Sequence, residues 1–259
     1  MVYKVRSLIT LTTDFGTSDE YAGVMKGVIL SKNPEAKIID ITHEIEPFNV
    51  EQAAIVIERA YKYFPRNTVH IAVVDPGVGG KRKEIIVYAQ GHFFVGPDNG
   101  IFSFPLKESK DVMVWEIERE RLGIKEISST FHGRDIFAPS AAILGLGNHP
   151  SEIGHPTREF VIIKELFPVE RGEDIVGRVI YFDRFGNAVT NIPNSSVEEG
   201  VLEVMGRLLK FFNCYEEGEG VFAIKGSGGF VEISSKMEDV RKLLKIEKGC
   251  KVICQKRKR

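Results

Sequence analysis

Residues 7–75 decide the fold, and they read SLITLTTDFGTSDEYAGVMKGVILSKNPEAKIIDITHEIEPFNVEQAAIVIERAYKYFPRNTVHIAVVD. Three segments have the alternating or wholly apolar pattern of strands, and they are Ser7–Thr13, Lys37–Thr42 and Thr68–Val74. Between them, residues 18–31 and 50–64 carry apolar side chains at helical spacing. This alternation of strands and helices predicts a parallel sheet with helices on its faces.

Strand patterns dominate the rest of the chain. Beyond Gly80 the predicted elements are strands at Glu84–Ala89, His92–Val95 and Asp111–Ile117 and a helix at Arg134–Leu146. From about residue 165 onward, short β-rich segments separated by turn residues predict a small barrel. We therefore predict an α/β fold, with an N-terminal α/β domain that has a largely parallel sheet (residues 1–164) and a smaller C-terminal β-barrel-like domain (residues 165–259).

Composition excludes several classes of protein. The chain has 259 residues, a net charge of −1 and an apolar share of 43%, which is typical of a globular protein and not of a disordered one. The near-zero net charge argues against a nucleic-acid-binding protein. No apolar run reaches the roughly 18–20 residues of a membrane span, and the stretch after Lys4 and Arg6 stops at Asp14, which is too short for a signal peptide. We interpret the basic end, residues 256–259, as a solvated tail.

The three cysteines, Cys214, Cys250 and Cys254, form an odd set. A disulfide-stapled secreted protein of this size is therefore not indicated, and the cysteines favour a reducing cytoplasm.

Polar residues follow the three strands of the first segment. Asp14, His43 and Asp75 stand directly after the first, second and third strand, where open α/β sheets bind ligands. Arg82 follows Asp75 by seven residues across a glycine-rich loop, so the two side chains are candidates for a carboxylate–guanidinium contact. The alternative is an ion pair at the surface. Asp19, at the start of the predicted helix, is equally compatible with a helix cap and with a functional role.

Two nucleotide-binding interpretations fail on context. Asp14-Phe-Gly16 and His132-Gly-Arg-Asp135 resemble kinase motifs, but they occur in reversed order and no glycine-rich loop precedes them. The stretch from Asp75 to Arg82 resembles a phosphate loop, but a true one needs Gly at its first position and Ser or Thr at its last.

One histidine is a candidate catalytic residue. His132 lies in a polar loop, residues 128–135, that leads into a helix N-terminus, an environment that holds ligands and tunes an imidazole. We expect His70, which is inside a strand, to be structural. His92, His149 and His155 adjoin predicted turns and are expected in solvent.

The C-terminal part contains a dense polar and aromatic cluster between Tyr181 and Asn191. The rings of Phe182 and Phe185 are suited to stack on a planar base, and Asp183, Asn187 and Asn191 to read its edge or a ribose. The alternative, a β-hairpin turn at Phe185–Asn187, is compatible with that role. A second glycine-rich corner, Gly226–Phe230, permits close approach of the backbone to a ligand.

Taken together, six motifs resemble a known family. They are Thr12-Thr-Asp-Phe-Gly-Thr-Ser-Asp19, Glu46-Pro-Phe48, Val74-Asp-Pro-Gly-Val-Gly79, Gly96-Pro-Asp-Asn-Gly100, Phe131-His-Gly-Arg-Asp135 and Phe185-Gly-Asn187. In this order they resemble the S-adenosyl-L-methionine (SAM) hydrolases, or SAM hydroxide adenosyltransferases, which are related to the fluorinase and chlorinase. The resemblance implies an N-terminal α/β domain, a C-terminal β-barrel-like domain, a homotrimer with sites between neighbouring chains, and hydrolysis of SAM to adenosine and L-methionine. SAM is then the substrate, and no cofactor, metal, nucleic acid or membrane is expected.

The resemblance also implies the roles of individual residues. The family's catalytic set falls on Asp75, Arg82 and His132. The substrate-binding positions are Asp14 at the ribose, Asp19 and Asp183 near the methionine, Phe48, Phe131, Phe185 and Asn187 around the adenosine, and Ser227 and Glu232 in the last glycine-rich segment.

The mechanism that we predict is attack of water on the ribose C5′ with the sulfonium as leaving group. Arg82 beside His132 would stabilise hydroxide character in the water, and Asp75 would fix Arg82. Two alternatives stay open, a halide-using SAM enzyme and a non-catalytic module that binds adenosine or SAM. The connection from Pro76 to the strand at Glu84 has no room for the fluorinase's long extra loop, which argues against fluoride.

Overall fold

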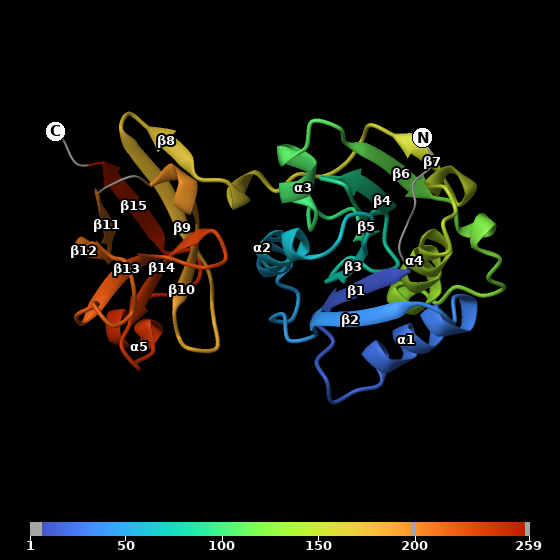
Figure 1. The fold of residues 1–259 in the computed structure, drawn as a ribbon, viewed down its shortest axis with the longest axis horizontal. Helices are drawn as coiled ribbons and strands as arrows, with labels where there is room; N and C mark the ends of the chain where they lie inside the picture. Colours follow the sequence, from blue (N-terminus) through green and yellow to red (C-terminus); the bar gives the residue numbers. More distant parts are fainter. Residues whose placement is uncertain (1–6, 198–199, 257–259) are drawn as a thin grey trace. The chain divides into compact units, whose positions relative to one another are not determined.

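The computed structural model describes residues 7–197 and 200–256 (Figure 1). Lys4, Arg6 and most of the predicted basic tail (residues 257–259) lie outside the described residues. The chain forms two compact units, residues 1–163 and 164–259.

A seven-stranded sheet forms the centre of the N-terminal unit, with the strand order β2-β1-β3-β5-β4-β6-β7. The strands are β1 (Leu8–Thr13), β2 (Lys37–Thr42), β3 (Val69–Val73), β4 (Glu84–Ala89), β5 (His92–Pro97), β6 (Met113–Ile117) and β7 (Gly154–Thr157). β2, β1, β3 and β5 run parallel to one another, whereas the β5–β4, β4–β6 and β6–β7 pairings are antiparallel. The predicted α/β class is confirmed, and the antiparallel half makes the sheet a mixed one.

The hairpin between β4 and β5 explains the change of direction. Its two turn residues, Gln90 (φ 53°) and Gly91 (φ 82°), both lie in the left-handed region, as a type I′ turn requires. A two-residue turn joins only antiparallel strands. β4 is therefore antiparallel to β5, and the antiparallel pairing continues through β6 and β7.

Helices cover both faces of this sheet (Figure 1). They are α1 (Tyr21–Lys32), α2 (Val50–Ala60), α3 (Ser103–Glu108) and α4 (Ala138–Gly145). Side chains of α1 and α4 pack with Ile9, Leu11 and Ile71 in one core cluster. Side chains of α2 and α3 pack with Ala72 and Val74 in a second cluster. Neighbouring strand residues thus point to opposite cores, as the two-residue period of a strand dictates.

The helix predicted at Arg134–Leu146 begins differently. Gly133–Phe137 forms a π-helical turn, in which the N–H of Ala138 donates to the carbonyl of Gly133, and α4 follows it. Pro139 supplies the physical reason, because it lacks the N–H that would bond the carbonyl of Asp135 in a regular helix.

The C-terminal unit is a closed β-barrel. Seven strands run in the order β10-β14-β13-β12-β11-β15-β9, and β9 pairs with β10 to close the ring. These strands are β9 (Asp174–Phe182), β10 (Ala188–Pro193), β11 (Gly200–Val204), β12 (Arg207–Phe212), β13 (Val221–Lys225), β14 (Phe230–Ser235) and β15 (Lys251–Lys256). A short strand, β8 (Val169–Arg171), lies beside β9, and one short helix, α5 (Val240–Leu244), follows β14. The predicted barrel-like domain is confirmed.

Candidate active site

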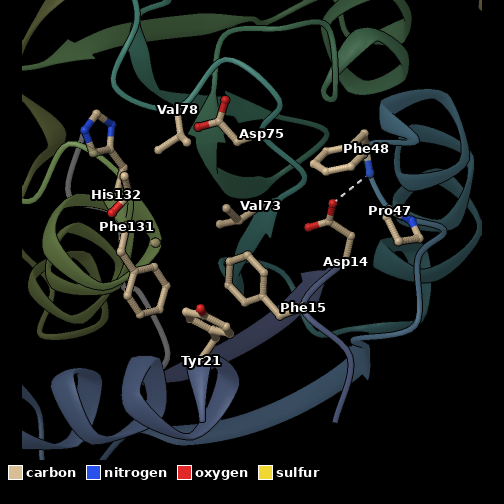
Figure 2. A pocket seen from close by; sticks show the side chains of 12 residues that line it. Asp14, Phe15, Tyr21, Pro47, Phe48, Val73, Asp75, Val78, Phe131 and His132 are labelled. Carbon is tan, nitrogen blue, oxygen red and sulfur yellow. Dashed lines mark hydrogen bonds between the residues drawn. The ribbon is translucent and has the colours of Figure 1, made fainter. Parts of the chain in front are cut away.

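A pocket of about 390 Å³ opens at the carboxyl ends of β1 and β3 in the N-terminal unit (Figure 2). Asp14 and Phe15 follow β1, and Asp75 and Val78 follow β3. The other lining residues come from the start of α1 (Tyr21), the end of β3 (Val73), the loop before α2 (Pro47, Phe48) and the segment that leads into the π-helical turn (Thr130, Phe131, His132, Gly133). This is the edge of the sheet at which the sequence predicts a ligand.

Asp14 holds the loop that carries Phe48. Its Oδ2 accepts a hydrogen bond from the backbone N–H of Phe48 at 2.9 Å. Phe48 has a φ of 66°, a left-handed conformation that an aromatic residue rarely adopts, and its side chain is 71% exposed. Burial raises the pKa of Asp14; the Phe48 N–H opposes this rise and the nearby Asp75 adds to it.

His43, the residue after β2, supports the turn at Asp14 and does not line the pocket. Its Nδ1 lies 2.8 Å from the Oγ1 of Thr13, and its carbonyl accepts the N–H of Gly16 at 2.7 Å. Its Nε2 lies 3.1 Å from Asp40. His43 is therefore buried structure behind the site.

Three aromatic rings form an apolar side of the pocket. The centroid of Phe131 lies 5.1 Å from that of Tyr21 and 5.7 Å from that of Phe15, both in edge-to-face geometry. The guanidinium of Arg134 lies 5.3 Å from the Phe131 ring centroid, on the ring's face. Phe131 was predicted from the sequence, whereas Phe15 and Tyr21 were not. Phe15 stands beside Asp14 in the same motif, which is the signal that would have found it.

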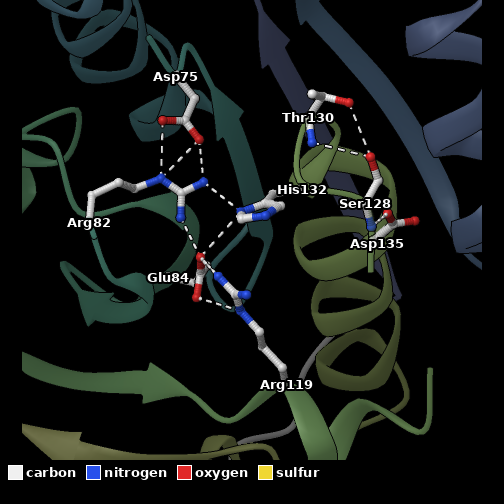
Figure 3. A network of polar contacts seen from close by, with 8 residues as sticks. All are labelled: Asp75, Arg82, Glu84, Arg119, Ser128, Thr130, His132 and Asp135. Carbon is white, nitrogen blue, oxygen red and sulfur yellow. Dashed lines mark hydrogen bonds and ion pairs between the residues drawn. The ribbon is translucent and has the colours of Figure 1, made fainter. Parts of the chain in front are cut away.

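Arg82 joins Asp75 to His132 (Figure 3). Its Nε donates to both carboxylate oxygens of Asp75, at 3.1 and 2.9 Å, and its Nη2 also contacts Asp75. The same Nη2 lies 2.8 Å from the Nδ1 of His132. Both Asp75 and His132 line the pocket, and Arg82 contacts them from behind its wall. The predicted carboxylate–guanidinium contact is present. The side chains of Arg82 and Asp75 are only 10% and 5% exposed, so the alternative of a surface ion pair is wrong.

The contact with Arg82 fixes the state of the His132 ring. A guanidinium is a donor only, so Nδ1 accepts, and the neutral ring carries its proton on Nε2. Burial is the largest cause that lowers the pKa of His132, and the charge of Arg82 is the next. The ring is therefore neutral near pH 7 and offers an N–H donor from Nε2.

Gly79 allows the two loops of this network to meet. It has a φ of 75°, and a Cβ at this position would lie 2.2 Å from the carbonyl oxygen of Ser129. The loop after β3 and the loop before the π-helical turn approach each other as closely as a glycine permits.

Two further charged residues complete the network, and the sequence analysis missed both. Glu84, the first residue of β4, accepts from Arg82 Nη1 and from Arg119, whose Nη2 lies at 2.8 Å and whose Nε lies at 3.3 Å. Its Oε1 is also 3.2 Å from His132 Nδ1. Although burial opposes the charge, the two guanidiniums keep the pKa of Glu84 below its ordinary value. A carboxylate at the start of an otherwise apolar strand was the available signal.

The polar cluster of the C-terminal unit lies in the loop between β9 and β10, which Asp183 holds together. The Oδ1 of Asp183 accepts the backbone N–H groups of Phe185 and Asn187, both at 2.9 Å, and its Oδ2 accepts from Asn187 Nδ2 at 3.0 Å. Tyr215, which the sequence analysis missed, donates to Glu232 Oε2 at 3.2 Å. The predicted hairpin turn is confirmed, and it leaves the Phe185 ring 82% exposed.

Several predicted residues lie elsewhere. Asp19 is exposed in the loop before α1 and does not line the pocket; the helix has Glu20 as its N-cap residue, so the capping alternative for Asp19 is wrong. Ser227 is exposed in the turn between β13 and β14. The ring of Phe182 packs against Arg241, 4.7 Å from the guanidinium, and its stacking on a base stays a prediction. His92, expected in solvent, is 4% exposed.

The described residues contain neither a cluster of metal-ligating side chains nor a helix suited to a membrane. Within residues 7–197 and 200–256, no three His, Cys, Asp or Glu side chains are grouped so as to hold a metal ion. In the same part of the chain, no helix has the length and apolar character that crossing a membrane requires.

Fold and site together define a two-unit α/β and β-barrel protein with a buried Asp–Arg–His network beside its pocket. A family model described as the SAM hydroxide adenosyltransferase N-terminal domain matches residues 9–154. The model of the C-terminal domain of the same family matches residues 177–253. The chain belongs to the SAM hydroxide adenosyltransferase family.

Named relatives agree with this assignment, and a solved structure has the same fold. The chain is 38% identical to the (R)-S-adenosyl-L-methionine hydrolase of Methanocaldococcus jannaschii over 94% of each protein. It is 34% identical to the enzyme of the same name from Thermus thermophilus, over 93% of this chain and 96% of that one. A fluorinase from Actinoplanes is more distant, at 25% identity over 74% of each. The crystal structure of an uncharacterized conserved protein from Thermotoga maritima superposes with a TM-score of 0.87 at 37% identity, covering 96% of this chain and all of that one.

Proposed function

We propose that this protein hydrolyses S-adenosyl-L-methionine to adenosine and L-methionine. The observation that carries the proposal is the Asp75–Arg82–His132 network at the wall of a pocket that Asp14 also lines. The names of the Methanocaldococcus and Thermus relatives, which share most of the chain's length, support the same reaction and specify the (R) epimer of the substrate.

In the proposed reaction, the oxygen of a water molecule bonds to the ribose C5′ while the C5′–S bond breaks and its electron pair goes to sulfur. The leaving methionine is neutral at sulfur, so no acid is needed. The difficulty lies in the nucleophile, because free water loses a proton only at a pKa of ~15.7. One water proton is released to solvent in the course of the step.

The chain's own residues address that difficulty. His132 offers the Nε2–H as a donor to the water oxygen, and the positive charge of Arg82 behind the ring favours hydroxide character. Asp75 anchors Arg82 and offsets its charge. As an anionic oxygen approaches a sulfonium, charge disperses, and the aromatic side formed by Phe15, Tyr21 and Phe131 favours that change.

Asp14 is the proposed ribose ligand. Its Oδ2 holds the Phe48 N–H, and the carboxylate retains further lone pairs for the two ribose hydroxyls. Such a contact fixes the sugar and directs C5′ toward the water. Phe48 and Phe131 are proposed to contact the adenosine, and Asp19 to lie near the methionine when substrate is bound.

We further propose a homotrimer whose sites lie between neighbouring chains. The support is that the two units of the chain carry different groups of the expected site. The N-terminal unit supplies the reacting groups, and the C-terminal unit carries an exposed ring at Phe185, the Asn187 amide, Asp183, Ser227 and the buried carboxylate of Glu232.

Incubation of purified protein with SAM in halide-free buffer tests the proposed function. Adenosine and methionine are the expected products, and in ¹⁸O-labelled water the label is expected at the 5′ oxygen. Halogenated adenosine on addition of chloride would establish the halide-using alternative, and unchanged SAM would establish a binding module. We propose that no cofactor takes part, so activity is expected to persist after dialysis against a chelator.

A further inference from the structure

The carboxylate of Glu84 lies at a junction of three groups that compete for it. Arg82 donates to it through Nη1, Arg119 donates through Nη2 and Nε, and His132 Nδ1 lies 3.2 Å from its Oε1 (Figure 3). The side chain of Glu84 is 7% exposed, that of His132 is 1% exposed, and that of Arg119 is 40% exposed. Arg119 therefore connects a buried charged cluster to the surface.

Glu84 gives the guanidinium of Arg82 a second anchor. Asp75 binds the edge formed by Nε and Nη2, and Glu84 binds Nη1. A planar group held by carboxylates at two edges has one orientation, and in this orientation Nη2 faces His132. With Asp75 alone, the guanidinium would keep its charge but lose this second constraint.

His132 Nδ1 has two neighbours that favour opposite protonation states of this nitrogen. Arg82 is a donor and requires the unprotonated nitrogen, whereas Glu84 is an acceptor and would hold a protonated one. Arg119 offsets the charge of Glu84 and occupies both of its oxygens. The two carboxylates Asp75 and Glu84 are thus matched by two guanidiniums, and the imidazole remains neutral.

We propose that Glu84 and Arg119 are positioning residues for catalysis: Glu84 orients Arg82, and Arg119 prevents Glu84 from drawing a proton onto His132. This inference rests on the proposed function for its kinetic consequence, and on geometry alone for the state of the ring.

Several charged groups around His132 shift the pKa of its ring in opposite directions. Burial, Arg82 and Arg119 lower the pKa of the ring, and Glu84 and Asp75 raise it. Asp135, in the π-helical turn that follows His132, interacts with His132 and is paired with Arg134. The titratable residues on the other packed elements are Tyr21, Lys26 and Lys32 on α1 and His92 on β5, and α4 has none. Lys26 is paired with Asp40, Lys32 donates to the carbonyl of Leu122, and His92 contacts His70.

The test compares Arg119→Gln with Arg119→Lys and with Arg121→Gln in the full chain. Arg121 lies with Arg119 on a short 3₁₀ helix (Arg119–Leu122), is 44% exposed and pairs with Glu118, so its loss removes an equal charge away from the network. Nitrogen-15 shifts of the His132 ring, assigned with His132→Asn, report its tautomer and titration without substrate. We expect an Nε2–H ring in the wild type and an apparent pKa about one unit higher in Arg119→Gln, while Arg119→Lys and Arg121→Gln stay near the wild type.

The kinetic consequence follows from the same shift. The acid limb of the kcat profile for SAM hydrolysis should move upward in Arg119→Gln, with a loss that approaches tenfold as the pH falls below the pKa of the wild-type ring and with recovery at alkaline pH. Glu84→Gln should lower kcat about tenfold or more at every pH with KM nearly unchanged, because Arg82 loses an anchor.

The outcomes separate the two proposals. If the wild type forms no adenosine, the proposed function fails, and the ring titration still decides the assignment of Arg119. If the wild type is active but the ring titration and pH profile of Arg119→Gln match those of Arg121→Gln, the positioning role is wrong. Arg119→Lys preserves the charge and keeps the comparison valid if Arg119→Gln proves unstable.

Discussion

Arg82 divides its hydrogen-bond donors among Asp75, Glu84 and His132. The sequence predicted the first contact, because seven residues and a glycine-rich loop separate Asp75 from Arg82. It could not predict the position of Glu84, whose partner Arg119 is 35 residues away on another strand connection. That contact exists only after β4 and β6 have paired. Local spacing thus identifies residues joined by one loop, and side chains brought together by sheet pairing require the tertiary structure.

Replacement of Arg82 is expected to impair turnover more than binding. Arg82→Ala removes the positive charge behind His132 and should lower kcat about 100-fold or more, with KM changed only a few-fold. Arg82→Lys keeps the charge but loses the planar fork, so we expect an intermediate loss. Steady-state kinetics together with thermal unfolding distinguish this effect from misfolding. Wild-type turnover in Arg82→Ala would contradict the role given to the guanidinium.

Replacement of Asp14 is expected to impair binding. In Asp14→Asn the amide oxygen still accepts the Phe48 N–H, but the charged acceptor for the ribose hydroxyls is lost. The KM for SAM should rise about tenfold, which corresponds to about 1.4 kcal/mol. Calorimetric titration with adenosine gives the same comparison without turnover. An unchanged affinity for adenosine would show that Asp14 holds only its own loop.

Most elements of both units were predictable from pattern, and the exceptions are short or irregular. β7 (Gly154–Thr157) and β8 (Val169–Arg171) are short and contain proline or charged residues, so their strand state depends on the neighbour they pair with. β12 pairs parallel with β13 inside an otherwise antiparallel barrel. The π-helical turn at Gly133–Phe137 differs from a regular helix by one hydrogen-bond step, which periodicity does not show.

A buried histidine pair makes the stability of the N-terminal sheet sensitive to pH. His70 on β3 contacts Thr10 on β1 at 2.8 Å and His92 on β5 at 3.2 Å. Burial is the main cause that lowers the pKa of His70 to about 3 and that of His92 to about 4. Below pH 6.5 the unfolded chain therefore gains protons that the folded chain refuses, and the free energy of unfolding falls as the pH drops from 6.5 toward 4.

The expected loss at pH 5, relative to pH 7, is about 2 kcal/mol for each of the two histidines. Urea unfolding at the two pH values measures it. In His92→Gln, which retains a polar partner for His70, the loss should be about 2 kcal/mol smaller than in the wild type. Equal losses in the two proteins would mean that other groups cause the pH dependence.

We expect that the loop after β3 can pack against the loop that carries His132 only with glycine at position 79. A Cβ in Gly79→Ala would lie 2.2 Å from Ser129 O, so the loop after β3 must move away from the loop that carries His132. We expect a loss of stability of about 2–4 kcal/mol and a large loss of kcat. Gly123→Ala is the matched control, because Gly123 has a similar φ of 65° but open space around it, and should cost about 1 kcal/mol with activity retained. Equal effects would point to backbone strain alone.

At the scale of the whole molecule, composition and strand order were sufficient for the α/β class and the barrel. The residues around the N-terminal pocket were largely identified by the rule that ligands bind beyond the strand ends, since Asp14 and Asp75 both lie there. Oligomer contacts leave no such local pattern in the sequence, so the homotrimer and the cytoplasmic location stay predictions.

Mixed oligomers test whether one site draws on two chains. Asp75→Asn and Phe185→Ala, each expressed alone, should be nearly inactive. If a site takes Asp75 from one chain and Phe185 from another, co-expressed and doubly tagged mixtures should regain a substantial fraction of activity. Light scattering on the same samples should give the mass of three chains. Continued inactivity of mixtures shown to be mixed would contradict a shared site.

The wide turn at Gly133–Phe137 makes the length of this stretch as consequential as its composition. One residue of a regular α-helix turns the chain by roughly 100°. Removal of any single residue here would therefore allow a regular α-helix to form and would rotate His132 away from Arg82. Asp75, Arg82 and His132 would all remain in the protein, yet the orientation of the His132 ring toward Arg82 would be lost. Deletions at this place should therefore be far less tolerated than substitutions of the residues that face outward.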